Sequence, residues 1–168
     1  MGHNTSDMIR KADNRDFDDI WPIFHEIVSQ GATFAFSPNT DRNEAFQIWM
    51  TTLTATYVYL DQGKVMGTYY IKPNQPGLGA HVCNAGYMVS RSARGRGIGR
   101  AMCQHSQTEA VKLGFKAMQF NLVVSTNKGA IKLWQDLGFS IVGTLPKAFR
   151  HKKRGLVDAF VMYKLFEE

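Results

Sequence analysis

Residues 91–100 read Arg-Ser-Ala-Arg-Gly-Arg-Gly-Ile-Gly-Arg, and this glycine- and arginine-rich stretch decides how the chain is interpreted. It follows an apolar run typical of a strand and opens an amphipathic pattern typical of a helix. Glycines let the main chain approach an anion closely, and the first N–H groups of a helix point at that anion with the helix dipole behind them. Arginine side chains add forked donors that suit phosphate oxygens. The stretch therefore predicts a phosphate-binding turn formed by Arg94, Gly95, Arg96, Gly97, Ile98, Gly99 and Arg100.

Two familiar phosphate-binding loops do not fit this turn. A Walker loop needs a Lys followed by Ser or Thr after its glycines, and the chain has Arg100 and Ala101 there. The dinucleotide-binding fingerprint lies near the start of a parallel strand–helix–strand unit with an acidic residue about 20 residues further on, and the match to it is poor. The turn therefore belongs to another class of phosphate site.

Hydrophobic periodicity and turn residues divide the rest of the chain into strands and helices. The predicted strands are Met8–Ala12, Thr56–Leu60, Lys64–Ile71, Val82–Val89, Ala117–Val124, Ser140–Leu145 and Val157–Leu165. The predicted helices run from an Asp16 cap to Gln30, from Asp41 to Thr52, from Ile98 to Leu113 and from Lys128 to Leu137. This order predicts an α/β fold with a central mixed sheet and helices on both faces, not a doubly wound parallel sheet.

The composition fits one globular domain. The chain has 168 residues, a net charge of +6 and 44% hydrophobic residues, and no apolar run approaches the ~20 residues that span a bilayer. We expect residues 1–7 to be disordered or left from expression, and residues 8–168 to form the domain. Cys83 and Cys103 match no disulfide framework or metal spacing, so we expect reduced thiols, a cytoplasmic protein and no metal site.

Two motifs resemble those of the Gcn5-related N-acetyltransferase (GNAT) superfamily. The signature Arg/Gln-x-x-Gly-x-Gly/Ala is present at residues 94–99, and residues 127–139 read Asn-Lys-Gly-Ala-Ile-Lys-Leu-Trp-Gln-Asp-Leu-Gly-Phe. The resemblance implies that the turn holds the pyrophosphate of acetyl-CoA and that Met88 and Val89 offer main-chain groups to its pantetheine arm. It also implies that Asn127 and Trp134 lie beside the coenzyme and that the sheet is splayed, as in the GNAT fold.

Two positions depart from the pattern common in this superfamily. Many members carry a Glu before the turn, which takes a proton from the amine through water, whereas residues 84–86 here read Asn-Ala-Gly. Many also carry a Tyr that reprotonates the CoA thiolate, but Trp134 stands at that place, and an indole N–H does not supply a proton near neutral pH. The route of the amine proton is therefore open, with water, Tyr70, Tyr87 and Ser125 as candidates.

Two unusual strand sequences narrow the resemblance. Residues 83–86 (Cys-Asn-Ala-Gly) and 120–123 (Phe-Asn-Leu-Val) look like those of fungal N-acetyltransferases that detoxify the proline analogue azetidine-2-carboxylate. Asn is a poor strand former, and a buried Asn must find hydrogen-bond partners. Either Asn84 and Asn121 are structural amides where the sheet splays, or they face the acceptor and align its amine. We expect the second role, in which they are the catalytic residues and act through proximity and orientation.

The resemblance also implies that the acceptor pocket forms between the first two helices and the last hairpin. Phe34 and Phe36 either fill the core or wall this pocket, and we expect them to bind substrate together with Tyr70, Asn84 and Asn121. The densest run of charge, at residues 150–154, is either a solvated hairpin tip or a contact for an anion.

The sequence thus predicts an acetyl-CoA-dependent N-acetyltransferase in which the amine of a small molecule attacks the thioester directly. The expected acceptor is an amino acid or a toxic amino-acid analogue. Acetylation of a protein or peptide amine and CoA binding without turnover stay open. Nucleic-acid binding is disfavoured, because aromatic residues are not interleaved with the basic ones. We expect a homodimer, with no nucleic-acid or membrane partner.

Overall fold

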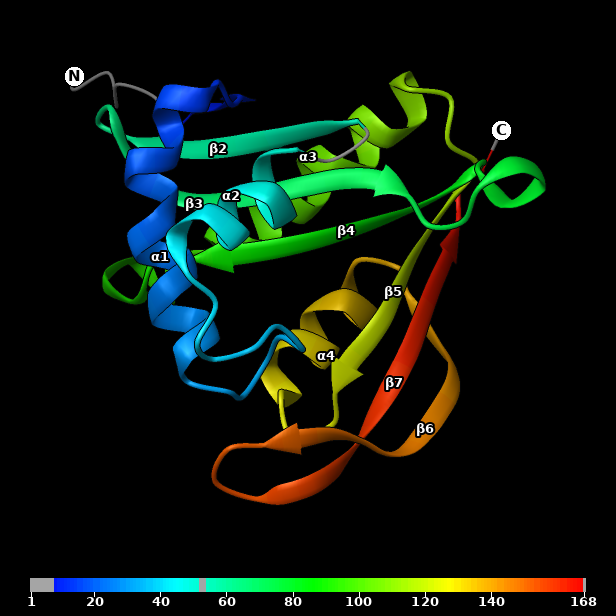
Figure 1. Cartoon of the computed structure of the whole chain (residues 1–168). Helices are drawn as coiled ribbons and strands as arrows, with labels where there is room; N and C mark the ends of the chain where they lie inside the picture. Colours follow the sequence, from blue (N-terminus) through cyan, green and yellow to red (C-terminus); the bar gives the residue numbers. More distant parts are fainter. Residues whose placement is uncertain (1–7, 52–53, 168) are drawn as a thin grey trace.

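The computed structural model describes residues 8–51 and 54–167, which form one seven-stranded sheet with helices on both faces (Figure 1). The strand order is β1-β2-β3-β4-β5-β7-β6, and every neighbouring pair is antiparallel except β4 with β5. This mixed α/β architecture confirms the predicted fold class. The predictions for residues 1–7 and for Thr52 lie outside the described residues.

The elements follow the predicted order. The strands are β1 (Met8–Lys11), β2 (Ala55–Asp61), β3 (Lys64–Pro73), β4 (Val82–Val89), β5 (Ala117–Val124), β6 (Ser140–His151) and β7 (Gly155–Leu165). The helices are α1 (Phe17–Ser29), α2 (Arg42–Met50), α3 (Ile98–Lys112) and α4 (Lys128–Asp136).

The sheet splits between its two parallel strands. β4 and β5 pair only at Val82 with Ala117, Cys83 with Met118, and Asn84 with Gln119. Beyond Asn84 the strands diverge, and β7 and β6 turn away from β4 together with β5 (Figure 1). The main-chain groups on the open side of β4 therefore have no strand partner from residue 85 onward.

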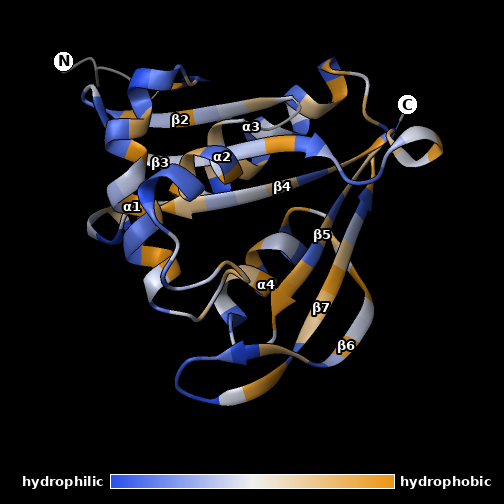
Figure 2. Cartoon of the chain, viewed as in Figure 1, coloured by the Kyte–Doolittle hydropathy of each residue, from blue (hydrophilic) through white to orange (hydrophobic). Residues whose placement is uncertain are grey.

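Two hydrophobic clusters fix the layers on either side of the sheet. α1 and α2 cover one face, where Phe24 and Trp49 are fully buried against Val58. α3 and α4 cover the other face, where Met102 packs with Phe120 and half-buried Trp134. The apolar residues concentrate between these layers, while the hairpin between β6 and β7 is hydrophilic at its tip (Figure 2).

Two local predictions need correction. Asp16 is the N-cap residue of α1, as predicted, but its side chain makes no capping hydrogen bond to this helix. Asp13 caps a short 3₁₀ turn before the helix, and the Asp16 carboxylate pairs with Arg10 at 2.8 Å. The hydrogen-bonded guanidinium lowers the pKa of the Asp16 carboxyl. A second correction is that β6 continues to His151 instead of ending at Leu145, because an irregularity between Leu145 and Phe149 breaks the alternation without ending the pairing.

Candidate active site

The predicted phosphate turn connects β4 to α3. Gly95 and Gly97 have left-handed backbones, with φ of +76° and +77°, and a Cβ at either position would meet no atom within 4 Å. Gly97 is the N-cap of α3, and no side chain caps the helix. The first N–H groups of α3 therefore have no side-chain cap, and the turn beside them has room for an anion such as a pyrophosphate.

The three arginines of the turn have different surroundings. Arg96 pairs with Asp61 of the β2–β3 hairpin at 2.5 Å, and Arg100 pairs with Asp136 of α4 at 3.4 Å. Arg94 is exposed and forms no ion pair within the described part of the chain. Arg94 is thus the arginine of the turn most available to an added phosphate.

The strand before the turn contributes its main chain. The side chain of Met88 is 1% exposed and packs in the α1–α2 layer, and Val89 packs against the other cluster. Both side chains therefore pack in the core. The main-chain groups of Met88 and Val89 belong to the edge of β4 that has no neighbouring strand, and such groups can pair with the amides of a pantetheine arm.

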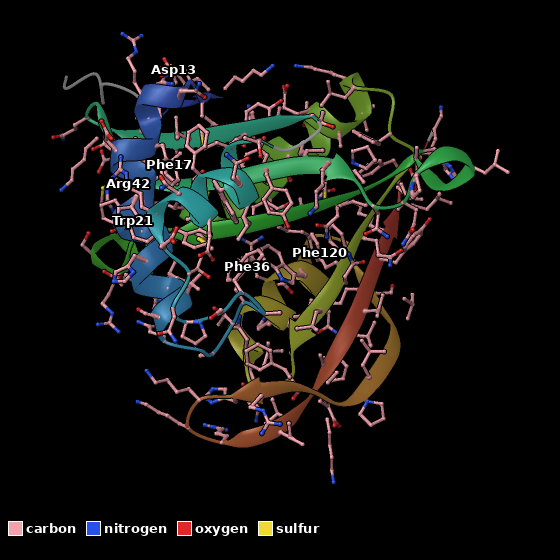
Figure 3. All side chains as sticks on the ribbon, viewed as in Figure 1. Asp13, Phe17, Trp21, Phe36, Arg42 and Phe120 are labelled. Carbon is pink, nitrogen blue, oxygen red and sulfur yellow. The ribbon has the colours of Figure 1, made fainter. Side chains whose placement is uncertain are left out.

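A cavity of about 340 Å³ opens where β4 and β5 diverge. Phe36 from the segment between α1 and α2 and Phe120 from β5 line it (Figure 3). It brings together all the predicted residues of the acceptor side and the two of the second motif, which are Phe34, Phe36, Tyr70, Asn84, Asn121, Asn127 and Trp134. Residues far apart in sequence thus line the same cavity.

Asn84 lies at the apex of the split and is 7% exposed. Its Oδ1 accepts a hydrogen bond from the Tyr70 hydroxyl at 3.0 Å, and its Nδ2 donates to the main-chain carbonyl of Gln119 at 3.0 Å. The amide therefore joins β3, β4 and β5, and it presents its remaining N–H at the cavity wall.

Asn121 lies two residues beyond Gln119 on β5 and is exposed. Its Nδ2 donates to Asn74 Oδ1 at 2.7 Å, and its Oδ1 accepts from Gln119 Nε2 at 3.0 Å. Both asparagines are thus held through Gln119, one by its carbonyl and one by its side chain. Sequence reasoning did not identify Gln119 or Asn74.

The two tyrosines considered as bases are both protonated groups in this structure. Burial raises the pKa of Tyr70 to about 12, and the Tyr70 hydroxyl already donates its proton to Asn84. Burial also raises the pKa of Tyr87 well above its ordinary value, and its hydroxyl bonds Ser106 at 2.5 Å, inside the core under α3. Tyr70 is suited to donate hydrogen bonds, and only the ring of Tyr87 serves the cavity.

The second motif supplies structure as well as a wall. The side chain of Asn127 is the N-cap of α4 and accepts from the Ala130 N–H at 3.4 Å. Trp134 packs against Tyr87 and Phe120, with ring centroids 5.1 and 5.2 Å apart, and lines the cavity. Trp134 therefore offers the cavity an aromatic, apolar surface.

The cavity is positive. Lys72 is the one charged side chain among the described residues that line it, and its Nζ lies 5.2 Å from the centre of the Tyr70 ring. Sequence reasoning missed Lys72, although the alternation of β3 places it on the same face as Tyr70. Within the described ranges, no three His, Cys, Asp or Glu side chains gather as a metal site would require.

The two cysteines are free thiols buried on either side of the β4–α3 contact, and neither is exposed. Burial raises the pKa of Cys83 to about 12 and also raises the pKa of Cys103. Both are therefore unreactive thiols rather than nucleophiles. None of the helices that the structure describes is both long and apolar enough to cross a bilayer.

Comparisons with known proteins agree with this geometry. Residues 16–139 match the acetyltransferase (GNAT) family. The chain is 35% identical over 151 residues to the N-acetyltransferase aca1 of Schizosaccharomyces pombe, covering 80% of this chain and 72% of that protein. This similarity to a fungal enzyme is consistent with the resemblance of residues 83–86 and 120–123 to fungal N-acetyltransferases.

Solved structures show the same fold. A GCN5-related N-acetyltransferase from Kribbella flavida superposes with a TM-score of 0.90 at 45% identity, over 95% of this chain and 97% of that one. The acetyltransferase yncA of Salmonella typhimurium, solved with its cofactor acetyl-CoA, superposes with a TM-score of 0.85 at 21% identity, over 98% and 96% of the two chains.

The fold, the glycine turn and the split sheet define an acyltransferase of the acetyl-CoA-dependent class. The chain belongs to the acetyltransferase (GNAT) family and is an N-acetyltransferase, as predicted from its two motifs.

Proposed function

We propose that the protein transfers the acetyl group of acetyl-CoA to the amine of a free amino acid or amino-acid analogue. The observation that carries this proposal is the cavity at the apex of the split, where two amides and one lysine converge between aromatic walls. A pocket of about 340 Å³ suits a small acceptor, and its positive charge suits an acceptor that carries a carboxylate.

Acetyl-CoA would be held by the turn and the open edge of β4, and it supplies an activated thioester that an amine can attack. The N–H groups at the start of α3, with Arg94, bind the pyrophosphate. The main chain of residues 85–89 binds the pantetheine arm. Asn127 and Trp134 bound the arm on the α4 side.

The acceptor lies against the opposite wall. Lys72 pairs with its carboxylate, and the free N–H groups of Asn84 and Asn121 orient the carboxylate or the thioester oxygen. Phe34 and Phe36 exclude water from this side. Rate enhancement then comes from proximity and orientation of two reactants held in one cavity.

The amine loses its proton to water in this proposal. None of the described side chains that line the cavity is a carboxylate or an imidazole, and Tyr70 holds its proton to about pH 12. The protein therefore selects the neutral form of the amine instead of deprotonating it with a side chain. Turnover would rise with pH until the acceptor amine itself is neutral.

Two specific observations favour other functions. The basic hairpin tip at residues 152–154 lies beside the segment that walls the cavity, which favours acetylation of an acidic peptide. Trp134 at the usual place of an acid favours a protein that binds CoA without turnover.

The proposal includes a cytoplasmic homodimer. β6 is an edge strand, its first seven residues (140–146) carry no charge, and Ile141, Val142 and Leu145 are exposed by 38%, 60% and 38%. An exposed apolar edge strand without charged residues to prevent edge-to-edge pairing favours association with a second copy of the chain.

The test is CoA thiol release from acetyl-CoA across azetidine-2-carboxylate, proline, phosphinothricin, methionine sulfoximine, common amino acids, polyamines and a lysine peptide. The proposal expects a clear preference for one or a few small amino acids. Activity on the peptide alone supports the first alternative. Acetyl-CoA binding without thiol release on any amine supports the second.

A further inference from the structure

A second cavity, of about 490 Å³, adjoins the acceptor cavity. Phe34, Ala35 and Phe36 line both cavities, so they form a shared wall. The other side of the second cavity is the end of β6, which lies beside the segment following α1 (Figure 1). The main-chain N–H of Lys152 donates to the Gly31 carbonyl at 2.9 Å and fixes the two together.

His151 presents an unpartnered donor at this cavity. The residue is 9% exposed, and its Nδ1 accepts hydrogen bonds from the N–H groups of Lys153 and Arg154 at 3.1 and 3.2 Å. The ring therefore carries its proton on Nε2, which points away from the hairpin tip. Within the described part of the chain, no protein group accepts from this Nε2. Because His151 is one of the residues that line the cavity, we take this N–H to be available to a ligand oxygen there.

Lys152 and Arg150 both line the cavity, and they differ in their hydrogen-bond and ion-pair partners. Lys152 directs its Nζ to the Ser29 carbonyl at 3.3 Å, where it stabilises the end of α1. Arg150 lines the cavity, is exposed and has no ion-pair partner within residues 8–51 and 54–167. No described residue that lines this cavity is acidic. The charged side chains of the cavity are thus all cationic, and its apolar lining includes Phe149.

We propose that the second cavity binds a distal anionic group of the acceptor, so that the substrate is an amino acid with a second acidic group on its side chain. This inference rests on the proposed function for the first cavity. The α-amine and α-carboxylate would occupy the first cavity, and the side chain would pass Phe34 and Phe36. A distal carboxylate or phosphonate then accepts from the Arg150 guanidinium and from His151 Nε2, a charge-assisted arrangement strengthened by apolar walls.

The experiment compares two acceptors of equal length, L-glutamate and L-glutamine, by kcat/KM for CoA thiol release. We expect glutamate to be preferred by about tenfold or more, as for hydrogen bonds to a charged group. R150M should reduce glutamate to the level of glutamine and leave glutamine unchanged. His151→Asn should act in the same direction, because Asn keeps an acceptor near the place of Nδ1 but has no group at Nε2. Lys153→Met is the matched control, since it removes one charge from the tip outside the cavity wall and should preserve the preference.

Binding separates this inference from the proposed function. L-glutamate and L-glutamine are titrated into the wild-type protein with CoA present, and the His151 ring nitrogens are followed by NMR. A change in the Nε2 chemical shift with glutamate but not with glutamine supports the subsite. It does so even if no amine is acetylated, because the absence of acetylation contradicts the proposed function and not the binding of glutamate. Acetylation of neutral amino acids, with glutamate no better than glutamine in rate or binding, overturns the subsite and leaves the proposed function standing.

Discussion

Gly86→Ala tests how the acceptor wall is held in place. Gly86 lies opposite Tyr70 in the β3–β4 pair, and a Cβ there would lie 2.7 Å from Tyr70 Cε1 and 3.1 Å from its hydroxyl oxygen. The Tyr70 ring has little space to move into, because the residue is only 7% exposed and the ring packs edge-on against Trp49, with ring centroids 4.9 Å apart. The substitution therefore displaces the ring and breaks its hydrogen bond to Asn84.

The size of the effect follows from these contacts. Overpacking a core costs about 1–3 kcal/mol of unfolding free energy. Losing the hydrogen bond that orients Asn84 costs a further ~1 kcal/mol. If the Asn84 amide aligns the acceptor, kcat/KM for the amine falls about tenfold, while the dissociation constant of acetyl-CoA stays within about twofold of the wild-type value.

The assay combines urea unfolding, CoA thiol release and acetyl-CoA binding. Gly143→Ala is the control, because Gly143 also lies in a strand and a Cβ there would meet no atom within 4 Å. In a Tyr70→Phe background, which lacks the hydroxyl, Gly86→Ala should change kcat/KM by less than about twofold. A Gly86→Ala variant with wild-type stability and wild-type kcat/KM would refute the reasoning.

Three further predictions concern the coenzyme turn, the asparagines and alkaline stability. Gly97→Glu places a side chain and a negative charge in the phosphate turn, at a position with a left-handed backbone. The affinity for acetyl-CoA, measured by calorimetry, should fall at least about 100-fold, while circular dichroism should show that the fold survives. Unchanged affinity would show that the turn does not bind acetyl-CoA. Asn84→Ala and Asn121→Ala should each lower turnover far more than they lower the affinity for acetyl-CoA. Asn84→Ala should also reduce the free energy of unfolding by about 1–3 kcal/mol, because it leaves the Tyr70 hydroxyl and the Gln119 carbonyl without these partners. Intact turnover in both variants would show that the amides are structural. Tyr70 and Cys83 are uncharged when protonated, and burial raises the pKa of each to about 12 in the folded state. The contribution of Cys83 to stability is therefore complete below about pH 9 and that of Tyr70 below about pH 10, and each is lost at about 1.4 kcal/mol per pH unit as the pH rises from there to about 12. A flat pH dependence of urea unfolding over this range contradicts the prediction.

The order of elements and the coenzyme turn could be predicted because each depends on local chemistry. Glycine permits the positive φ that Gly95 and Gly97 adopt, and the strand and helix that flank them follow from periodicity. The fold that the two family motifs indicate brings predicted residues from β3, β4, β5 and α4 to one cavity, including Tyr70 and Asn84.

The remaining features depend on which strands meet and in what register. Gln119 supports both asparagines only because β4 pairs with β5 for three residues and then diverges, a distance that no local pattern sets. His151 was assigned to a loop because the β6 irregularity hides the alternation, so neither its burial nor its place at a second cavity was visible. Asp16 looked like a cap because its alternative partner, Arg10, lies in β1.

The most direct test of the central claim compares free L-proline with a tripeptide that begins with proline. Both offer a secondary amine of the same ring, but only the free amino acid carries a carboxylate that can reach Lys72 and the two amides. The account predicts that kcat/KM for CoA thiol release, measured at the pH optimum of each acceptor, is at least about tenfold higher for free proline. Equal or faster transfer to the tripeptide would contradict a small amino-acid acceptor and make the protein a peptide acetyltransferase.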